Sequence, residues 1–362
     1  MISRRRCLLL TGRIYISKST CRILIVSGLL LFMFHVALMI SAYKDCQPFE
    51  PEIDTDFPAG TETEPIIPHI LHQTSKTEHV KASYKGYIKS FTDTNPDWQY
   101  YFWTDDSARK LVLEKRPDFI PVWDSYEDPV NRADALRYVV LYEFGGVYAD
   151  LDFECLRPLA RVTSKYACIF SPEPFEMSVL TYNRHYFMSN AIMMCRPKHP
   201  FFKLMIDNLF LYQVLREKID VAGPTFVTSN FLQYNNLQQH YNDFYKELKP
   251  QSNSPFFYKG ALPEDHSEAV YVANSKYFFN TLDTYNYRVL RMFRDCFLFY
   301  SLNFNQKRAC PELFKRYMSF RSKYAYAEHH WIHSYVTRIS DIIWPHQEYM
   351  HIKDIVKHAQ IY

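Results

Sequence analysis

Two aspartates separated by one residue are the feature of the sequence best suited to chemistry. Asp150 and Asp152 follow the glycine pair Gly145-Gly146. From residue 147 to 153 apolar and polar residues alternate, which predicts one strand that presents Tyr148, Asp150 and Asp152 on the same face. Carboxylates this close repel each other, and a hard divalent cation such as Mn²⁺ or Mg²⁺ relieves that repulsion and can hold a diphosphate. Pairs of spaced acids are common by chance, so the pair needs support from its context.

The segment before the glycines offers that context. Asp128-Pro129 is typical of a helix start, and the glycine pair predicts its end after Phe144. Within this helix Asp134 and Arg137 are three residues apart and share a face. One interpretation is an ordinary surface ion pair. The other has Asp134 accept hydrogen bonds from sugar hydroxyls while Arg137 donates to a hydroxyl or a phosphate.

Alternating strand and helix patterns lead up to this segment. A β-branched run from Ile66 to Thr74 predicts a first strand, and residues 98–103 (WQYYFW) predict a second. Weaker helical patterns cover residues 81–92 and 107–115. This order predicts an α/β sheet, in which ligands bind at the carboxyl ends of the strands.

Composition narrows the class of protein. Of the 362 residues, 48% are hydrophobic and 22% are charged, which excludes global disorder. The aromatic content of 17% suits a carbohydrate site and a well-filled core equally. Six Lys or Arg and no acid lie in residues 1–22, and the remainder is nearly neutral. A nearly neutral body excludes a nucleic-acid binder, which needs a basic face.

A twenty-residue apolar run covers residues 23–42, and His35 is its only ionisable member. Twenty helical residues span the roughly 30 Å of a bilayer core. The basic residues before it predict a cytoplasmic tail (1–22), a transmembrane anchor (23–42) and a luminal remainder. A cleaved signal peptide is the alternative, but its apolar core is usually shorter.

The luminal part divides further by composition. Residues 43–65 are acidic and contain proline, which predicts a stem, and they are followed by a catalytic domain (66–340) and a C-terminal tail (341–362). Six cysteines in an oxidising lumen allow up to three disulfides in fifteen complete connectivities. The sequence contains neither a CxxC pair nor an N-glycosylation sequon.

Ordered motifs over most of residues 66–335 resemble glycosyltransferase family 32. These are IPHILHQT, WTDD, NRADALRYVVLYEFGGVYADLDFECLRPL, NAIMMCRPKHPFF, AGP at 222–224 and AEHHWIHSY. The resemblance implies a GT-A fold, a Rossmann-like mixed sheet that binds a nucleotide sugar and is flanked by helices. It also implies transfer with retention of anomeric configuration.

The resemblance also implies roles for individual residues. Asp152 is expected to ligate the metal, and Asp150 to contact the ribose or the metal through water. His329 is the candidate for a third metal or diphosphate contact, although His330 and His333 compete for it. The other expected donor contacts are Asp134 and Arg137 at the sugar, Tyr148 in the nucleotide pocket, and His72 and Gln73 beside the base. Ser75 and Tyr335 stand where the family often has Trp, which leaves substrate identity open.

The predicted function is therefore metal-dependent hexosyl transfer at the Golgi membrane, with no residue assigned as a covalent nucleophile. The DFECLRP stretch is most similar to the inositol phosphorylceramide mannosyltransferases, which implies GDP-mannose as donor and a glycolipid or glycan acceptor. UDP-galactose or UDP-N-acetylglucosamine is the alternative donor. A haloacid-dehalogenase-type phosphatase is disfavoured because its motif continues with x-Thr/Val rather than Phe153-Glu154. A non-catalytic membrane lectin or an inactive homologue is the remaining alternative.

Overall fold

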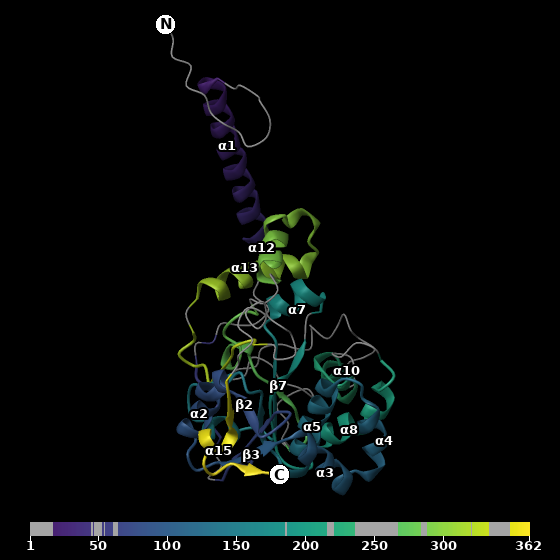
Figure 1. The fold of residues 1–362 in the computed structure, drawn as a ribbon. Helices are drawn as coiled ribbons and strands as arrows, with labels where there is room; N and C mark the ends of the chain where they lie inside the picture. The colour runs from purple at the N-terminus through teal and green to yellow at the C-terminus, as the bar shows by residue number, and fades with distance from the viewer. Residues whose placement is uncertain are drawn as a thin grey trace.

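A seven-stranded mixed sheet forms the centre of the computed structural model (Figure 1). The structure describes residues 17–44, 46, 53, 55–60, 64–184, 187–215, 221–235, 267–283, 288–319, 321–332 and 348–362. In spatial order the strands are β11 (Gln360–Ile361), β3 (Gln99–Trp103), β1 (Ile70–Thr74), β4 (Gly146–Ala149), β7 (Met188–Cys195), β6 (Cys168–Pro172) and β8 (Tyr271–Val272). Strand β1 is parallel to β3 and β4, whereas β7 is antiparallel to β4 and β6. The predicted α/β architecture with a mixed sheet is confirmed.

Helices cover both faces of this sheet, and each face has its own hydrophobic core. One core contains side chains of α3 (Asp105–Lys115), α4 (Ile120–Ser125), α5 (Pro129–Phe144), α8 (Pro200–Tyr212) and α10 (Pro224–Tyr234). The other contains side chains of α2 (Lys85–Thr94), α6 (Ala160–Thr163), α7 (Phe175–Tyr182), α12 (Arg288–Phe297), α13 (Phe304–Met318) and α15 (Ile352–Ile355). Two short ribbons complete the domain, β10 (Tyr349–His351) with β2 (His79–Lys81) and β5 (Phe153–Cys155) with β9 (Ala327–His329).

Helix α5 begins and ends as the sequence predicts. The Asp128 carboxylate accepts the N–H of Val130 at 2.9 Å, which caps the first turn. Gly145 and Gly146 adopt φ values of 67° and 100°, a region that favours glycine. A Cβ atom on Gly146 would lie 2.5 Å from the carbonyl oxygen of Ile70, so this glycine also allows β4 to approach β1.

The aspartate pair does not lie on one continuous strand, which corrects the prediction for residues 147–153. Strand β4 ends at Ala149, where the N–H of Asp150 donates to the carbonyl of Ala191 at 2.9 Å. The chain then turns, and the N–H of Phe153 donates back to the Asp150 carbonyl at 3.1 Å. Strand β5 starts at Phe153 and leaves the main sheet to pair with β9. The turn therefore places Asp150 and Asp152 close to β9, which lies much later in the sequence.

The boundaries of the globular domain extend beyond the expected ones on both sides. Phe57, in the expected stem, is fully buried in the core, and Asp56 pairs with Arg157 at 2.8 Å. At the other end, β11 joins the main sheet beside β3, so residues 360–361 are part of the fold rather than of a tail. Trp344 lies outside the described residues.

Helix α1 (Lys18–Tyr43) projects from one end of the domain, opposite the C-terminus (Figure 1). Among the described residues it is the one helix long and apolar enough to cross a membrane. Its large apolar side chains from Ile23 to Phe34 are exposed, which agrees with the predicted anchor.

A disulfide joins Cys296 of α12 to Cys310 of α13, fourteen residues apart. Closing a loop of this size lowers the entropy of the unfolded chain, which by the loop-entropy model is worth about 3 kcal/mol. We expect a reducing agent to lower the free energy of unfolding of the protein by about this amount, measured by urea denaturation.

The Cys296→Ala/Cys310→Ala variant is the control for this effect and is expected to show the lower stability with or without reductant. Equal stability of the unsubstituted protein in both conditions would argue against the disulfide.

Candidate active site

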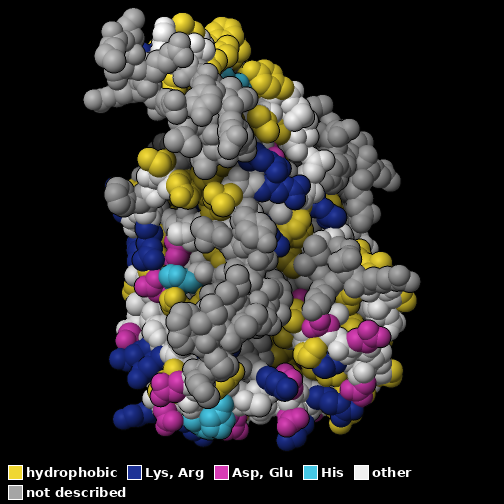
Figure 2. Space-filling view, turned by 45° about the horizontal axis from the view of Figure 1, so that its top comes forward, with side chains coloured by type: hydrophobic (Ala, Val, Ile, Leu, Met, Phe, Trp, Pro, Cys, Tyr) yellow, Lys and Arg dark blue, Asp and Glu magenta, His cyan; other side chains and the backbone are white. Residues whose placement is uncertain are grey.

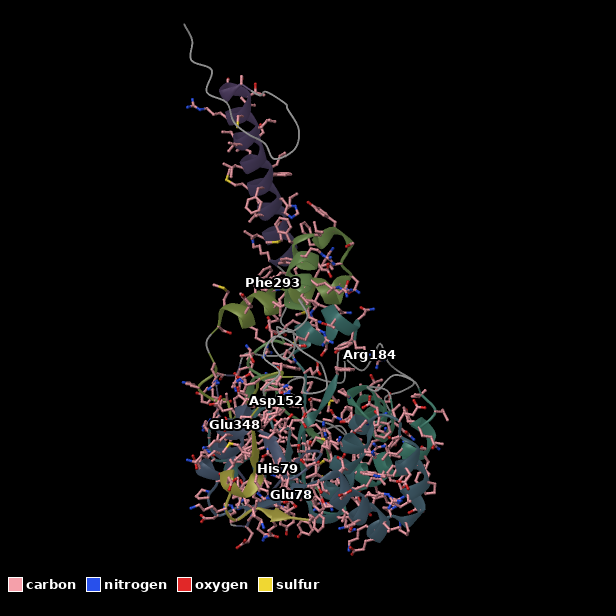
Figure 3. The ribbon with its side chains drawn as sticks, in the orientation of Figure 1. Glu78, His79, Asp152, Arg184, Phe293 and Glu348 are labelled. Carbon is pink, nitrogen blue, oxygen red and sulfur yellow. A yellow bond between two sulfur atoms is a disulfide. The ribbon has the colours of Figure 1, made fainter. Side chains whose placement is uncertain are left out.

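Three side chains converge where β4 ends. Oxygen atoms of Asp150 and Asp152 and a ring nitrogen of His329 all lie within 4.8 Å of one another. His329 Nε2 is 3.2 Å from Asp152 Oδ1. The β5–β9 ribbon creates this contact, because it places Phe153 directly opposite His329 and stacks their rings with centroids 4.6 Å apart. Figure 3 marks Asp152 within the domain.

Asp152 is held as an anionic ligand. Its Oδ2 accepts the N–H of Ile332 at 2.8 Å, which leaves Oδ1 toward His329. Burial acts to raise the pKa of Asp152, but His329 and the N–H of Ile332 outweigh it, so the pKa lies well below its usual range. Burial acts to lower the pKa of His329, and Asp152 and Asp150 outweigh it in the opposite direction. Asp152 is thereby kept in the ionised form that a metal ligand requires.

This donor set fits a divalent cation. Two carboxylates and one imidazole suit Mn²⁺ and related ions, and the oxygens also suit Mg²⁺. The side chain of Asp150 is 25% exposed, so a ligand can reach it from solvent. Nδ1 of His329 is buried and has no hydrogen-bond partner among the described residues, which leaves part of the ring's capacity unused. Asp150, Asp152 and His329 are thus the residues able to hold the predicted metal.

Arg137 links the helix to the aspartate turn. Its Nη2 lies 3.2 Å from Asp134 Oδ1 and 3.1 Å from Asp150 Oδ1. Its Nη1 donates to the carbonyl of Asn190 at 2.9 Å, and Tyr148 donates its hydroxyl to Asp150 Oδ1 at 2.7 Å. Arg137 is buried, so the interpretation as a surface ion pair is wrong. In this arrangement Arg137 and Tyr148 orient Asp150.

Burial opposes the ionisation of the three carboxylates that lie close together in this site. Burial raises the pKa of Asp134 to about 7, against the opposing effect of Arg137. Burial also raises the pKa of Asp150; Arg137 opposes this shift, and Asp152 adds to it. These carboxylates lie beside one guanidinium and one imidazole, and a bound cation would favour their ionised forms.

Three of the expected nucleotide contacts are buried. His72 is fully buried on the α5 side of the sheet, where its ring nitrogens bond Gly145 and Trp103 at 2.9 and 3.1 Å. Burial lowers its pKa to about 4. Its place beside the base is therefore corrected, because both nitrogens are already engaged. Tyr148 is only 1% exposed. Its burial corrects its expected place in the nucleotide pocket.

Gln73 points to the opposite face of β1 and lies next to the site without reaching solvent. It donates to the Asp150 carbonyl at 3.3 Å and accepts the hydroxyl of Tyr100 at 2.7 Å. The expected contact with the base is thus replaced by support of the aspartate turn.

The choice between neighbouring histidines is also clear in the structure. His330 turns away from Asp152, bonds Glu154 Oε2 at 3.0 Å and stacks on Tyr87. His329 is the histidine grouped with the two aspartates. His333 and Tyr335 lie outside the described residues.

Two residues near the site carry no distinctive local pattern. The Asn190 amide donates to Asp134 Oδ1 at 3.0 Å, and the NAIMMC motif is the one sequence signal at this position. Glu173 is buried directly after β6, and burial raises its pKa to about 7 against the opposing effect of His329. An acid between two prolines in SPEPF was its only signal.

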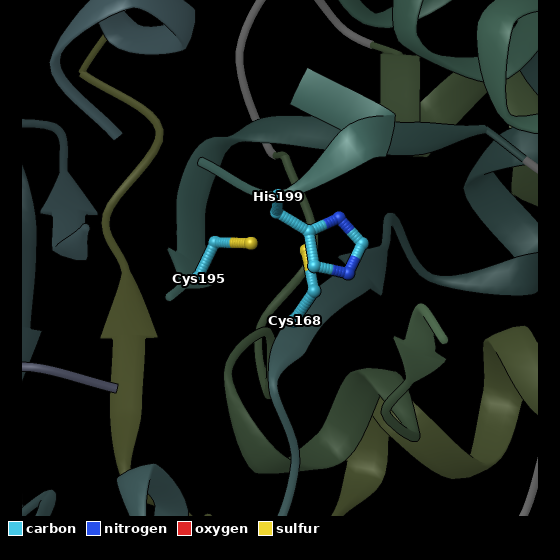
Figure 4. A group of neighbouring side chains, drawn as sticks. All are labelled: Cys168, Cys195 and His199. Atoms are coloured by element: carbon cyan, nitrogen blue, oxygen red, sulfur yellow. The ribbon is translucent and has the colours of Figure 1, made fainter. Parts of the chain in front are cut away.

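A second group of potential ligands lies elsewhere in the core. Cys168, Cys195 and His199 come together on β6, β7 and the start of α8 (Figure 4). All three are fully buried, and Nδ1 of His199 accepts the N–H of Phe201 at 3.2 Å as a helix cap. A group without access to solvent and with a capping histidine suits the core better than a substrate site.

Comparison with known proteins connects this geometry to a reaction class. Residues 81–169 match the family model described as the glycosyltransferase sugar-binding region containing the DXD motif. This segment is similar to the DXD region of glycosyltransferases. The matched segment includes Asp134, Arg137, Asp150 and Asp152, which the structure brings together. The resemblance to glycosyltransferase family 32 is thereby confirmed.

Several curated relatives of this chain are fungal. Inositol phosphoceramide mannosyltransferase 2 of Schizosaccharomyces pombe is 38% identical over 40% of this chain and 39% of its own length. Mannosyl phosphorylinositol ceramide synthase SUR1 of Saccharomyces cerevisiae is 31% identical over 56% of this chain and 50% of its own length. The matches thus span about half the length of these relatives or less. The solved structure of PaToxG glycosyltransferase superposes with a TM-score of 0.37 at 18% identity, over 63% of this chain and 88% of that one.

Proposed function

We propose that this chain transfers a hexose from a nucleotide sugar to a glycolipid or glycan acceptor, with GDP-mannose as the donor. The convergence of Asp150, Asp152 and His329 within the DXD region is the observation that carries the proposal. When bound, a divalent cation such as Mn²⁺ would stabilise the negative charge that develops on the departing diphosphate.

Each residue of the site has its own role in the proposed transfer. Asp152, His329 and Asp150 would hold the cation, and Asp150 would also contact the donor ribose. Arg137 and Tyr148 fix the orientation of Asp150, which the short contacts of 3.1 and 2.7 Å support. Asp134 and Arg137 also face the donor sugar in this proposal. Retention of anomeric configuration rests on the family resemblance alone.

The relatives and α1 support a proposal for the acceptor and the location. The names of the fungal relatives refer to inositol phosphoceramide or to phosphorylinositol ceramide, which suggests a sphingolipid acceptor at a membrane. Helix α1 is long and apolar enough to serve as the anchor. We accordingly propose a single-pass type II protein of the Golgi membrane with its catalytic domain in the lumen.

A thermal-shift panel of the full chain in detergent tests the donor and the reaction class together. GDP-mannose, UDP-galactose and UDP-N-acetylglucosamine are each added with Mn²⁺ and with a chelator. A ligand at a hundred times its Kd stabilises a folded protein by about 2.7 kcal/mol, which shifts Tm measurably. We expect GDP-mannose to raise Tm only when Mn²⁺ is present.

The other outcomes separate the alternatives. A shift with a UDP-sugar alone would keep the reaction class and replace the donor. No shift with any sugar nucleotide would contradict the proposal and favour a non-catalytic lectin.

A further inference from the structure

Helices α12 and α13, joined by the 3₁₀ turn Phe299–Ser301, form a hairpin between α1 and the catalytic domain (Figure 1). The Cys296–Cys310 disulfide ties its two helices together. The α12–α13 hairpin, defined as residues 288–318, contacts the proposed anchor and is absent from the mechanism above.

The hairpin reaches far along α1. Tyr43, at the end of α1, donates its hydroxyl to the Cys296 carbonyl at 2.6 Å. Eight residues earlier, His35 Nε2 bonds the Phe297 carbonyl at 2.8 Å, and its Nδ1 lies 3.2 Å from the hydroxyl of Tyr300. Eight helical residues span roughly 12 Å. The turn of the hairpin therefore lies beside the middle of the apolar run.

These contacts explain how the apolar run of α1 can contain one ionisable side chain, His35. A polar ring within hydrocarbon needs partners from the protein, because lipid tails offer none. The Phe297 carbonyl and the Tyr300 hydroxyl supply both, and the rings of Phe297 and Phe299 pack on His35 at 4.4 and 5.7 Å. If residues 23–42 lie in the bilayer, the turn of the hairpin lies there with them.

The outer surface of the hairpin fits this environment. Leu290, Tyr300 and Phe304 are between 64% and 73% exposed, and Leu298 is 50% exposed. Arg291 and Arg294 are exposed beside them on α12. Residues 288–318 contain seven Lys or Arg and two acids. Exposed apolar side chains next to cations are typical of helices that lie in the headgroup region of a membrane.

The space-filling view agrees with this arrangement. Figure 2 shows hydrophobic side chains together with Lys and Arg side chains at the end of the molecule that carries α1. The rings of Phe32 on α1 and Phe297 on α12 stack with centroids 6.1 Å apart, so apolar side chains of the anchor and the hairpin lie in contact.

We propose that the α12–α13 hairpin is a second membrane contact, which inserts its turn and the exposed face of α12 into the luminal leaflet beside α1. This inference rests on the proposed membrane anchor and not on the donor or the reaction. Its occupant is the phospholipid bilayer; a second copy of the chain on the same surface is the competing outcome.

The hairpin also fixes how the domain sits on the membrane. Helix α13 packs on α7, and the buried Arg316 of α13 pairs with Glu176 of α7. Helix α7 starts two residues after Glu173, which is buried near His329. In Figure 3, Asp152 lies between Phe293 of the hairpin and the far end marked by Glu78 and His79. A docked hairpin therefore holds the metal-binding residues at a set height above the lipid headgroups.

Photo-crosslinking of the full chain in phosphatidylcholine–phosphatidylserine nanodiscs tests the proposal. p-Benzoylphenylalanine replaces Leu298, and lipid adducts are quantified by mass spectrometry. Leu113 on α3 is the matched control, because it is also an exposed leucine, with the same exposed fraction of 50%, and lies at the opposite end of the domain. Phe32 of α1 is the positive control. We expect adduct yields at Leu298 at least about tenfold above those at Leu113 and comparable with those at Phe32.

Three results would overturn the inference. They are a yield at Leu298 no higher than at Leu113, a crosslink from Leu298 to a second copy of the chain in place of lipid, and no lipid adduct at Phe32, which would remove the anchor itself. The Tm shift with GDP-mannose and Mn²⁺, measured on the same samples, reports independently on the proposed function.

Discussion

Replacing Asp152 with asparagine is expected to lower kcat/KM for sugar transfer by about 10³-fold or more. The amide retains the size of the side chain and an oxygen that can accept the N–H of Ile332, but it loses the charge that faces His329. Stabilisation of a departing diphosphate by a cation is worth several kcal/mol, and each 1.36 kcal/mol corresponds to about tenfold in rate. The variant should also lose the Mn²⁺-dependent Tm shift with the donor.

Asp93→Asn is the matched control for this prediction. Asp93 is 60% exposed on α2 and pairs only with Lys89 among the ion pairs of the described residues. Its variant should transfer sugar at the unsubstituted rate. Transfer by Asp152→Asn at that same rate, with the same dependence on Mn²⁺, would remove Asp152 from the site.

Replacing Arg316 with methionine is expected to lower the free energy of unfolding by about 3–5 kcal/mol. Arg316 and Glu176 form a buried pair, and the guanidinium also donates to the Phe279 carbonyl and to the Ser275 hydroxyl. Methionine leaves the Glu176 carboxylate buried without its cation, which is the costly part of breaking such a pair. Urea denaturation measures the change.

Two further variants show whether the unpaired charge is responsible. Arg109→Met breaks an exposed pair with Asp124 and should leave stability unchanged within error. Glu176→Met/Arg316→Met removes both charges and should be more stable than Arg316→Met alone. A double variant that is less stable than the single one would show that packing, not the unpaired carboxylate, dominates.

Local sequence patterns predict the helices and strands whose ends carry strong start and stop signals. Helix α5 starts at the Asp128 cap and stops at Gly145 because both signals act within one turn of the backbone. The same patterns predicted a single strand through Asp152, which the structure replaces with a turn and a second strand. The alternation of apolar and polar residues indicates which face of a strand each side chain occupies, but it does not indicate which other strand pairs with it. The partner of β5 is β9, about 170 residues later in the chain.

The candidate site shows the same difference between what local patterns predict and what depends on distant parts of the chain. Spacing within one predicted helix and one predicted strand indicates Arg137 and the two aspartates. His329 was found only through the family resemblance, because no local pattern brings residue 329 to residue 152. His72 was misplaced because neighbouring residues of a buried strand face opposite sides, and the order of strands decides which side carries the site.

Anomalous diffraction at the manganese edge, from crystals of the protein grown with Mn²⁺ and GDP, would test the cation site most directly. The account predicts one strong peak within coordination distance of Asp152 Oδ1 and a ring nitrogen of His329, with the diphosphate on its open side. An ion bound instead by Cys168, Cys195 and His199, or no ion at Asp152 while GDP is bound, would contradict it.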